Sequence, residues 1–269
     1  FGGDWSDAFA VLRTAGASAL ALPLGEALTA AKLIAASGVQ PLPGWATLAP
    51  SAAGSVDSSG RFTGRASSVP WGANADAVVF DLDGKLLVAS TKDARTERRD
   101  NPAGEARDTL IFEAAPVQVG HPTLSAAHAG AFVRVAQFAG ALDAALAISI
   151  QYANERQQFG KPIGKFQAVQ QALAVFAEEA AAVNCAGQAA ASALDCGDAA
   201  FEIAAAKVRA NIAADIGVTT AHQVHGAIGF TQEHSLHHLT RRLMSWRSEF
   251  GSERYWSEIV GVQVCSRGA

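Results

Sequence analysis

Apolar positions along the chain follow two spacings, which divide it into helical and β-rich parts. Near the start, Phe9 and Leu12 lie one helical turn apart, and a second helix is expected between Pro23 and Gly38, because glycine commonly ends a helix. In the last half, alanine-rich stretches carry apolar residues three or four positions apart, and the first of these helices should end near Arg156. The spacing therefore predicts helices in both end regions.

The middle of the chain has short β-favouring runs separated by turn-forming residues. The runs 77–82 and 85–88 flank Asp83-Gly84. An Asp-Gly pair between two such runs is a strong signal for a two-residue hairpin. The segment Thr91–Asp108 is polar and charged, and we expect a loop there. These features indicate a small β sheet or barrel.

Together the patterns predict an α+β fold in three parts. Residues 1–43 form a partial N-terminal helical region, residues 44–119 a reduced middle β domain, and residues 120–269 a C-terminal four-helix bundle. The sequence starts at Phe1 rather than at Met, and we expect further residues upstream.

Composition narrows the possible functions. Apolar residues make up 49% of the 269 residues, which is enough for a packed core and excludes a disordered chain. The net charge of −4 gives no basic excess for a phosphate backbone, so we do not expect nucleic-acid binding. Cys185, Cys196 and Cys265 form no CxxC pair, which predicts a reducing, cytoplasmic location, and the first two are expected to be inert core thiols.

Neither a membrane span nor a metal site is expected. The most apolar candidate stretch, Ala15–Ala36, is interrupted by Pro23, Glu26 and Lys32. Several histidines cluster late in the chain without an acidic residue that completes a clear ligand set, so cap and surface roles are expected for them.

Two short segments in the helical half carry the residues best suited to binding a ligand. The first, residues 156–163, combines Arg156, Phe159 and Gly160 at a helix-to-helix turn. Arginine forms charge-assisted bonds to phosphate or carboxylate, and glycine lets a backbone approach a ligand closely. The second, residues 223–233, has two glycines beside polar side chains. From these residues alone, a capped turn and a simple helix break remain the alternatives.

Taken together, the two segments resemble the C-terminal helical domain of acyl-CoA dehydrogenases. The resemblance rests on the R-x-Q-F-G-K-P-I turn, on the Phe-Gln pair that follows it, and on Q-x-x-G-x-x-G-F further along. Residues 64–79 are similar to that family's N-G-x-K-x-W-I-T-N-A-x-x-A-D stretch, and residues 1–43 resemble the close of its N-terminal helical domain. The resemblance implies an acyl-CoA dehydrogenase-like fold.

The resemblance also implies a role in binding FAD, which in this family lies across a subunit interface. The residues that would reach the adenosine diphosphate end of the neighbouring subunit's FAD are Arg156, Phe159, Gln223 and Ala227. Alanine at position 227 departs from the usual glycine by one methyl group.

The family's contacts to the flavin ring are missing. Its Trp position aligns with Ser68, which has no ring to pack on the flavin, and its Thr position aligns with Pro70, which has neither a hydroxyl nor an N–H. The loop that precedes them in the family is reduced to residues 48–55. We therefore expect this chain's own flavin cleft to be degraded.

The catalytic base is also missing. The reaction needs a carboxylate that takes the α-proton of the thioester. The usual family position aligns with Phe250, just before Gly251, and the alternative position aligns with Gly130. Glu249 is a weak candidate, because a shift of one residue turns a helical side chain by about 100°. The alternative is an exposed helix glutamate.

The resemblance therefore predicts the non-catalytic subunit of a heteromeric acyl-CoA dehydrogenase. It implies an α₂β₂ heterotetramer with a catalytic partner that holds most of the acyl-CoA site, with FAD shared at their interface, and with a bulky substrate such as a steroid side-chain CoA thioester. Two alternatives stay open. One is a self-sufficient enzyme with Glu249 or Glu233 as a displaced base, and the other is a non-enzymatic assembly subunit.

Overall fold

The chain folds into two compact units, each described here by itself. The structure, a computed structural model, describes residues 3–267. The helical unit comprises the residues up to Leu20, Arg134–Ser248 and the residues from Ser252 onward, and the β unit comprises Ala21–Val133 with Glu249–Gly251.

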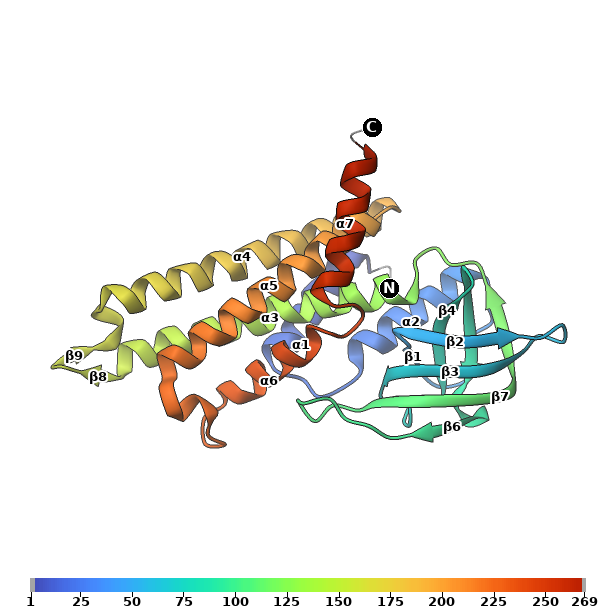
Figure 1. Cartoon of the computed structure of the whole chain (residues 1–269), viewed down its shortest axis with the longest axis horizontal. Helices are drawn as coiled ribbons and strands as arrows, with labels where there is room; N and C mark the ends of the chain where they lie inside the picture. Colours follow the sequence, from blue (N-terminus) through green and yellow to red (C-terminus); the bar gives the residue numbers. More distant parts are fainter. Residues whose placement is uncertain (1–2, 268–269) are drawn as a thin grey trace. The chain divides into compact units, whose positions relative to one another are not determined.

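Long antiparallel helices build the helical unit, in which α4 and α5 run side by side (Figure 1). Its elements are α1 (Trp5–Ala17), α3 (Ala126–Glu155, from Arg134 onward), β8 (Gln157–Gln158), β9 (Lys161–Pro162), η2 (Ile163–Lys165), α4 (Gln167–Cys196), α5 (Ala200–His225), η3 (Gly226–Phe230), α6 (Leu236–Trp246) and α7 (Glu253–Arg267). Small residues permit close helix packing, since a Cβ on Gly187 would overlap the Phe9 ring. The predicted α+β fold with C-terminal helices is confirmed.

A curled seven-stranded sheet and one helix build the β unit. Its elements are α2 (Leu24–Ser37), β1 (Ala46–Leu48), β2 (Ser51–Val56), β3 (Arg61–Pro70), β4 (Ala77–Leu82), β5 (Lys85–Ser90), η1 (Thr91–Asp93), β6 (Ala94–Glu97) and β7 (Arg107–Gly120). The strand order is β1-β4-β5-β7-β3-β2, with β6 paired to β7. The start of β7 pairs with β3 and β6 and its end pairs with β5, so this strand joins both halves of the sheet.

Three phenylalanine rings form the centre of the β unit's core. The ring centroids of Phe62 lie 5.0 Å from Phe80 and 5.6 Å from Phe112. The predicted hairpin is present, since β4 and β5 are joined by Asp83 and Gly84 with φ angles of 49° and 74°. Both angles are positive, which is the backbone of a type I′ turn.

The expected loop over Thr91–Asp108 is wrong in part, because only residues 98–106 lie outside helices and strands. This segment contains η1, β6 and the start of β7, and a bridge pairs Asp100 with Ala106. The physical reason is that β6 pairs with β7 alone and remains partly solvated, so its strand sequence reads as polar.

The expectation of buried cysteines is also wrong, because all three cysteines are exposed. The buried face of α4 runs through Val183, Gly187, Ala190 and Ala191. Cys185 lies two positions beyond Val183, which places it about 200° around the helix from that residue.

The most apolar long segment is α3 rather than the stretch Ala15–Ala36. Among the described helices, α3 alone has the length and composition of a membrane span. However, 72% of its most apolar window is buried inside the protein, which is typical of a core helix.

A buried lysine holds the end of α6 in the helical unit. Lys207 is fully buried, and its Nζ donates to Asn211 Oδ1 at 2.9 Å and to the carbonyl oxygens of Trp246 at 3.2 Å and Arg247 at 3.4 Å. The last carbonyls of a helix lack partners within the helix, and a cation there also favours the helix dipole. Lys207 therefore stabilises the C-terminal end of α6.

We expect Lys207→Met to lower the free energy of unfolding by roughly 2–4 kcal/mol, because it removes the donor for two buried acceptors and one partly buried acceptor. Urea denaturation followed by circular dichroism measures this. Lys165→Met, which changes an exposed lysine in the same unit, should shift the midpoint little. Equal midpoints for the two variants would contradict the assigned role of Lys207.

In the β unit, Phe250 packs directly against Gly130. A Cβ built on Gly130 would overlap the Phe250 ring, whose residue is 2% exposed. Phe250 has a φ of 51°, a left-handed conformation that is uncommon for a bulky residue. The contact therefore requires glycine at position 130.

We expect Gly130→Ala to destabilise the protein by about 1–3 kcal/mol through overpacking against Phe250. The cost should shrink when Phe250→Ala is also present, so a double-mutant cycle in urea should show strong coupling. Gly261→Ala, with open space at its Cβ, is the matched control. Additive effects of the changes at positions 130 and 250 would refute the contact.

Candidate functional site

The structure brings the ends of α3 and α5 together at one end of the helical unit (Figure 1). Tyr152, in the last turn of α3, stacks on His225, the last residue of α5, with ring centroids 4.5 Å apart and planes at 24°. Arg156 follows directly, and its N–H donates to the Tyr152 carbonyl oxygen at 2.9 Å. Of the four residues assigned by resemblance to FAD binding, Arg156 and Phe159 lie on the first turn at this end, Ala227 lies on the second, and Gln223 lies in the last helical turn of α5 before it.

The first turn is a tight hairpin that presents an aromatic ring. Its strands, β8 and β9, are joined by Phe159 and Gly160 with φ angles of 52° and 77°. Phe159 is 93% exposed, and its ring meets the edge of the Phe166 ring at 6.2 Å. A large apolar side chain that is both exposed and held in an uncommon backbone conformation is typical of a binding surface.

Backbone contacts fix the hairpin at the start of α4. The N–H of Ile163 donates to the Arg156 carbonyl oxygen at 2.8 Å, and Gln170 Nε2 donates to the Gly164 carbonyl oxygen at 2.9 Å. Lys161 Nζ lies 4.4 Å from the centre of the Phe166 ring. The exposed side chain of Arg156 therefore starts from a well-ordered backbone.

The second turn begins where α5 ends at Gly226, which has a φ of 62°. Gln223 and Ala227 are exposed on either side of this glycine. Phe230, at the end of η3, is 72% exposed and stacks on His222 with centroids 4.0 Å apart. The extra methyl group of Ala227 points from an exposed position, so it leaves the backbone of the turn accessible.

The sequence analysis missed the ring cluster of Tyr152, His225 and His234, which joins the two turns. The His234 ring lies 4.7 Å from His225 and 6.2 Å from Tyr152. Burial lowers the pKa of His225, and the nearby imidazoles of His234 and His222 add to this effect. The only signal in the sequence was an aromatic residue one turn before Arg156 together with histidines that end a helix.

In the β unit, the positions aligned with the flavin-ring contacts are unsuited to that role. Ser68 is exposed, has a φ of 55°, and lies where the β3–β7 register shifts between Ala66 and Val69. Pro70 is buried and lies opposite Arg107. Residues 51–56 form β2, which pairs along its length with β3 instead of forming a loop.

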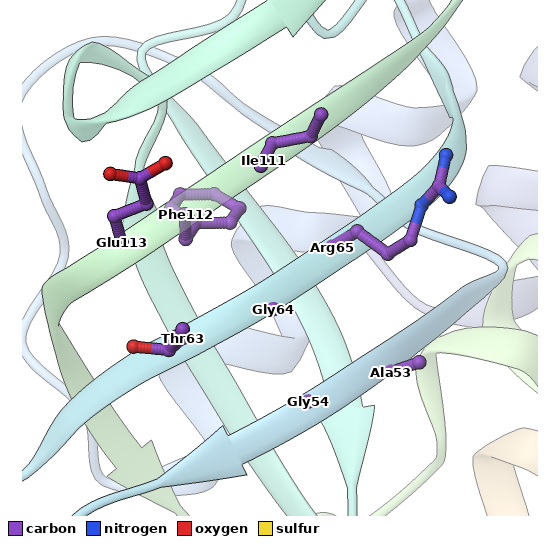
Figure 2. Close-up of a pocket in the computed structure, with 8 residues that line it drawn as sticks. All are labelled: Ala53, Gly54, Thr63, Gly64, Arg65, Ile111, Phe112 and Glu113. Atoms are coloured by element: carbon purple, nitrogen blue, oxygen red, sulfur yellow. The ribbon is translucent and has the colours of Figure 1, made fainter.

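The β unit has a hollow of about 580 Å³ on the strands β2, β3 and β7 (Figure 2). Gly54 and Gly64 lie side by side in its centre, while Arg65 and Glu113 lie toward opposite sides (Figure 2). Of its eight lining residues, all within the described chain, the one aromatic residue is Phe112, which is 1% exposed and part of the core. The hollow therefore offers no exposed ring for stacking on a flavin.

Glu249, the weak candidate for a catalytic base, is bound in a buried ion pair. Its Oε1 accepts from Arg107 Nε at 2.8 Å and from Asn101 Nδ2 at 2.8 Å, and its Oε2 accepts from Arg107 Nη2 at 2.9 Å. Glu105 also accepts from Arg107 Nη2, at 2.9 Å. Because both oxygens of Glu249 are engaged and its side chain is 11% exposed, the geometry favours a structural role.

The two positions that the resemblance assigns to a base meet at one place in the β unit. They are Phe250 and Gly130, the pair already described as packed against each other. Two alternative base positions of one reaction should lie near the same carbon atom, and their contact here agrees with that alignment. Neither side chain takes up a proton.

Comparison with known proteins identifies the family. The family model for the acyl-CoA dehydrogenase C-terminal domain matches residues 123–264, more than half of the chain. Glutaryl-CoA dehydrogenase of Desulfococcus multivorans is 30% identical over 181 residues, which cover 66% of this chain and 43% of the relative. The chain thus matches less than half the length of this relative, and the same holds for the other curated relatives.

Solved structures show the same fold. A chain of the ChsE4-ChsE5 complex from Mycobacterium tuberculosis matches with a TM-score of 0.89 and 22% identity, covering 96% of this chain and 80% of that one. A variant of the Tcur3481-Tcur3483 steroid ACAD (acyl-CoA dehydrogenase) matches with a TM-score of 0.90 and 22% identity, covering 98% and 82%. The fold, the two turns and the family match agree, and the chain belongs to the acyl-CoA dehydrogenase family.

Proposed function

We propose that this chain is the non-catalytic subunit of a heteromeric, FAD-dependent acyl-CoA dehydrogenase. The observation that carries the proposal is the contact between Phe250 and Gly130. Dehydrogenation of an acyl-CoA thioester removes the α-proton to a carboxylate and the β-hydride to the flavin. Both base positions are filled by residues without a proton acceptor, so the reaction requires another chain.

In the proposed function, the helical unit binds the nucleotide end of FAD. Arg156 would pair with the pyrophosphate, Phe159 would pack on the adenosine end, and Gln223 with the backbone at Ala227 would supply hydrogen bonds. The exposed Phe159 ring and the ordered Arg156 backbone fit such a ligand. The chemistry that FAD supplies when bound is hydride acceptance, and Ser68 and Pro70 do not fit its ring.

The FAD ring and the acyl-CoA would therefore lie mainly in a catalytic partner subunit, in an α₂β₂ heterotetramer. Two structural neighbours support this assembly. One is a chain of the ChsE4-ChsE5 complex, and the other is the Tcur3481-Tcur3483 steroid ACAD, which is named after two proteins. A steroid side-chain CoA thioester is the proposed substrate class. The exposed, free cysteines support a reducing, cytoplasmic location.

A self-sufficient enzyme is the less supported alternative. Glu249 would have to leave its forked pair with Arg107 before it could accept a proton, and breaking such a buried pair is costly. Glu233 is exposed in the turn before α6, which belongs to the helical unit. A purely structural assembly subunit differs from the proposed function in one measurable property, the dependence of FAD content on Arg156.

The chain purified alone should hold no stoichiometric flavin and should not oxidise acyl-CoA. The reason is the missing base and the missing ring contacts at Ser68 and Pro70. Absorbance spectra after desalting, with and without added acyl-CoA, measure both properties. Co-expression with the neighbouring reading frame should restore a yellow complex. Reduction of bound FAD by acyl-CoA in the chain alone would refute the proposal.

Arg156→Ala should weaken FAD retention by the co-expressed complex by roughly 10- to 150-fold, because a charge-assisted bond to phosphate contributes about 1.5–3 kcal/mol. FAD content after dialysis against dilute buffer measures this directly. Arg98→Ala, an exposed arginine in the β unit, is the control and should keep full FAD content. Normal FAD content in the Arg156 variant would favour the assembly subunit instead.

A further inference from the structure

We propose that the ring cluster of Tyr152, His225 and His234 positions the two FAD-binding turns, and that it does so only while His225 is uncharged. This inference rests on the proposed function, because it concerns the same turns. It assigns His225 as a positioning residue, which acts through Arg156, Gln223 and Ala227 and not through contact with FAD.

The contacts of His225 connect every segment that carries the turns. Its ring stacks on Tyr152, one helical turn before Arg156, at 4.5 Å. Its Nδ1 lies 2.7 Å from the carbonyl oxygen of Ala221 in α5, and its ring meets the edge of His234, beyond η3, at 4.7 Å. The residue is 4% exposed, so these contacts replace solvent on nearly all sides.

The hydrogen bond fixes which nitrogen of His225 carries the proton. A carbonyl oxygen only accepts, so Nδ1 must be the donor, and Nε2 is then the unprotonated nitrogen. Nε2 is buried and has no hydrogen-bond partner within the described part of the chain. Protonation would place a charge at this atom without an acceptor.

The surroundings of His225 oppose the charged form. The groups that face it are the Tyr152 ring from α3, the His222 ring one turn earlier in α5, and the His234 ring from the segment after η3. No carboxylate acts on it among the described residues. Burial lowers the pKa of His225 below its ordinary value and the two imidazoles add to this effect, while the hydrogen bond to the Ala221 carbonyl opposes it in part.

Acidic pH should weaken the ring cluster, because folding lowers the pKa of His225. The pKa of His225 is lower in the folded chain than the value of about 6.5 for an unfolded histidine. The stabilisation that the ring cluster gives to the two turns is therefore fully present well above pH 6.5. It is lost as the pH falls from there toward the pKa of His225 in the folded chain. Within that window, opening of the cluster should become easier as the pH falls, by at most tenfold per pH unit.

Loss of the cluster would release both turns while the remaining helices stay folded. The Arg156 backbone is tied to Tyr152, and residues 226–235 are tied to α3 through the rings. Separation of the rings would let the two turns move independently. The expected result is weaker FAD retention at acidic pH without global unfolding.

Hydrogen exchange on the purified chain tests the positioning role without FAD. Exchange of residues 156–163 and 226–235, divided by the intrinsic rate at each pH, should rise by up to about fivefold from pH 6.5 to 5.5, because a free histidine is already half-protonated at pH 6.5. His225→Phe keeps a ring for stacking but cannot be protonated, so its profile should be flat. His234→Ala, a second variant, should exchange faster at all pH values, and His121→Phe, an exposed histidine in the β unit, should behave as the unaltered chain.

FAD content of the co-expressed complex across the same pH range connects this role to binding. The unaltered complex should lose FAD up to about fivefold more readily at pH 5.5 than at 6.5, and the His225→Phe complex should not. An unchanged pH profile for exchange in His225→Phe overturns the positioning role, even if Arg156→Ala loses FAD. A flattened exchange profile together with full FAD content in Arg156→Ala supports the positioning role and overturns the proposed function.

Discussion

The contact of the Phe250 ring with Gly130 is the constraint on which the function of this chain depends. The absence of a Cβ at position 130 makes room for the ring, and the forked pair of Glu249 with Arg107 holds the adjacent backbone in the β unit. Together they keep Phe250 in a left-handed conformation that it would rarely adopt alone. Under the proposed function, the position of the proton acceptor is thus filled by a well-packed hydrocarbon ring, and restoring a carboxylate there would need changes on several segments at once.

The helical unit shows the opposite arrangement, because its uncommon conformations expose side chains instead of burying them. Phe159, Gly160 and Gly226 all have positive φ angles at the two turns, and Phe159 and Phe230 are left open to solvent. Strained backbone at such positions persists only when its surroundings hold it. The Tyr152–His225 stack and the backbone bonds of the hairpin supply that support for the backbone of the two turns.

Local signals in the sequence predicted much of this fold, and non-local contacts account for the rest. The Asp83-Gly84 hairpin and the helix stop at Gly38 depend on a few neighbouring residues, and each is present. In contrast, β6 is stabilised by pairing with β7, which its polar sequence does not reveal. The Tyr152–His225 stack joins helices far apart in sequence, so no spacing rule could show it. The turn at Arg156–Gly160 was visible because all of its determinants are adjacent.

The same difference explains why one half of a cofactor site can be retained while the other is lost. The two turns for the nucleotide end are each built at a helix end from consecutive residues, so changes elsewhere leave them intact. A seat for the flavin ring needs correct strand register, and in β3 the register shifts between Ala66 and Val69, next to an exposed Ser68. A proton acceptor needs a side chain beside Gly130, where the Phe250 ring lies. The turns therefore depend on local sequence, whereas the ring seat and the proton acceptor depend on long-range geometry, which is consistent with the proposed function.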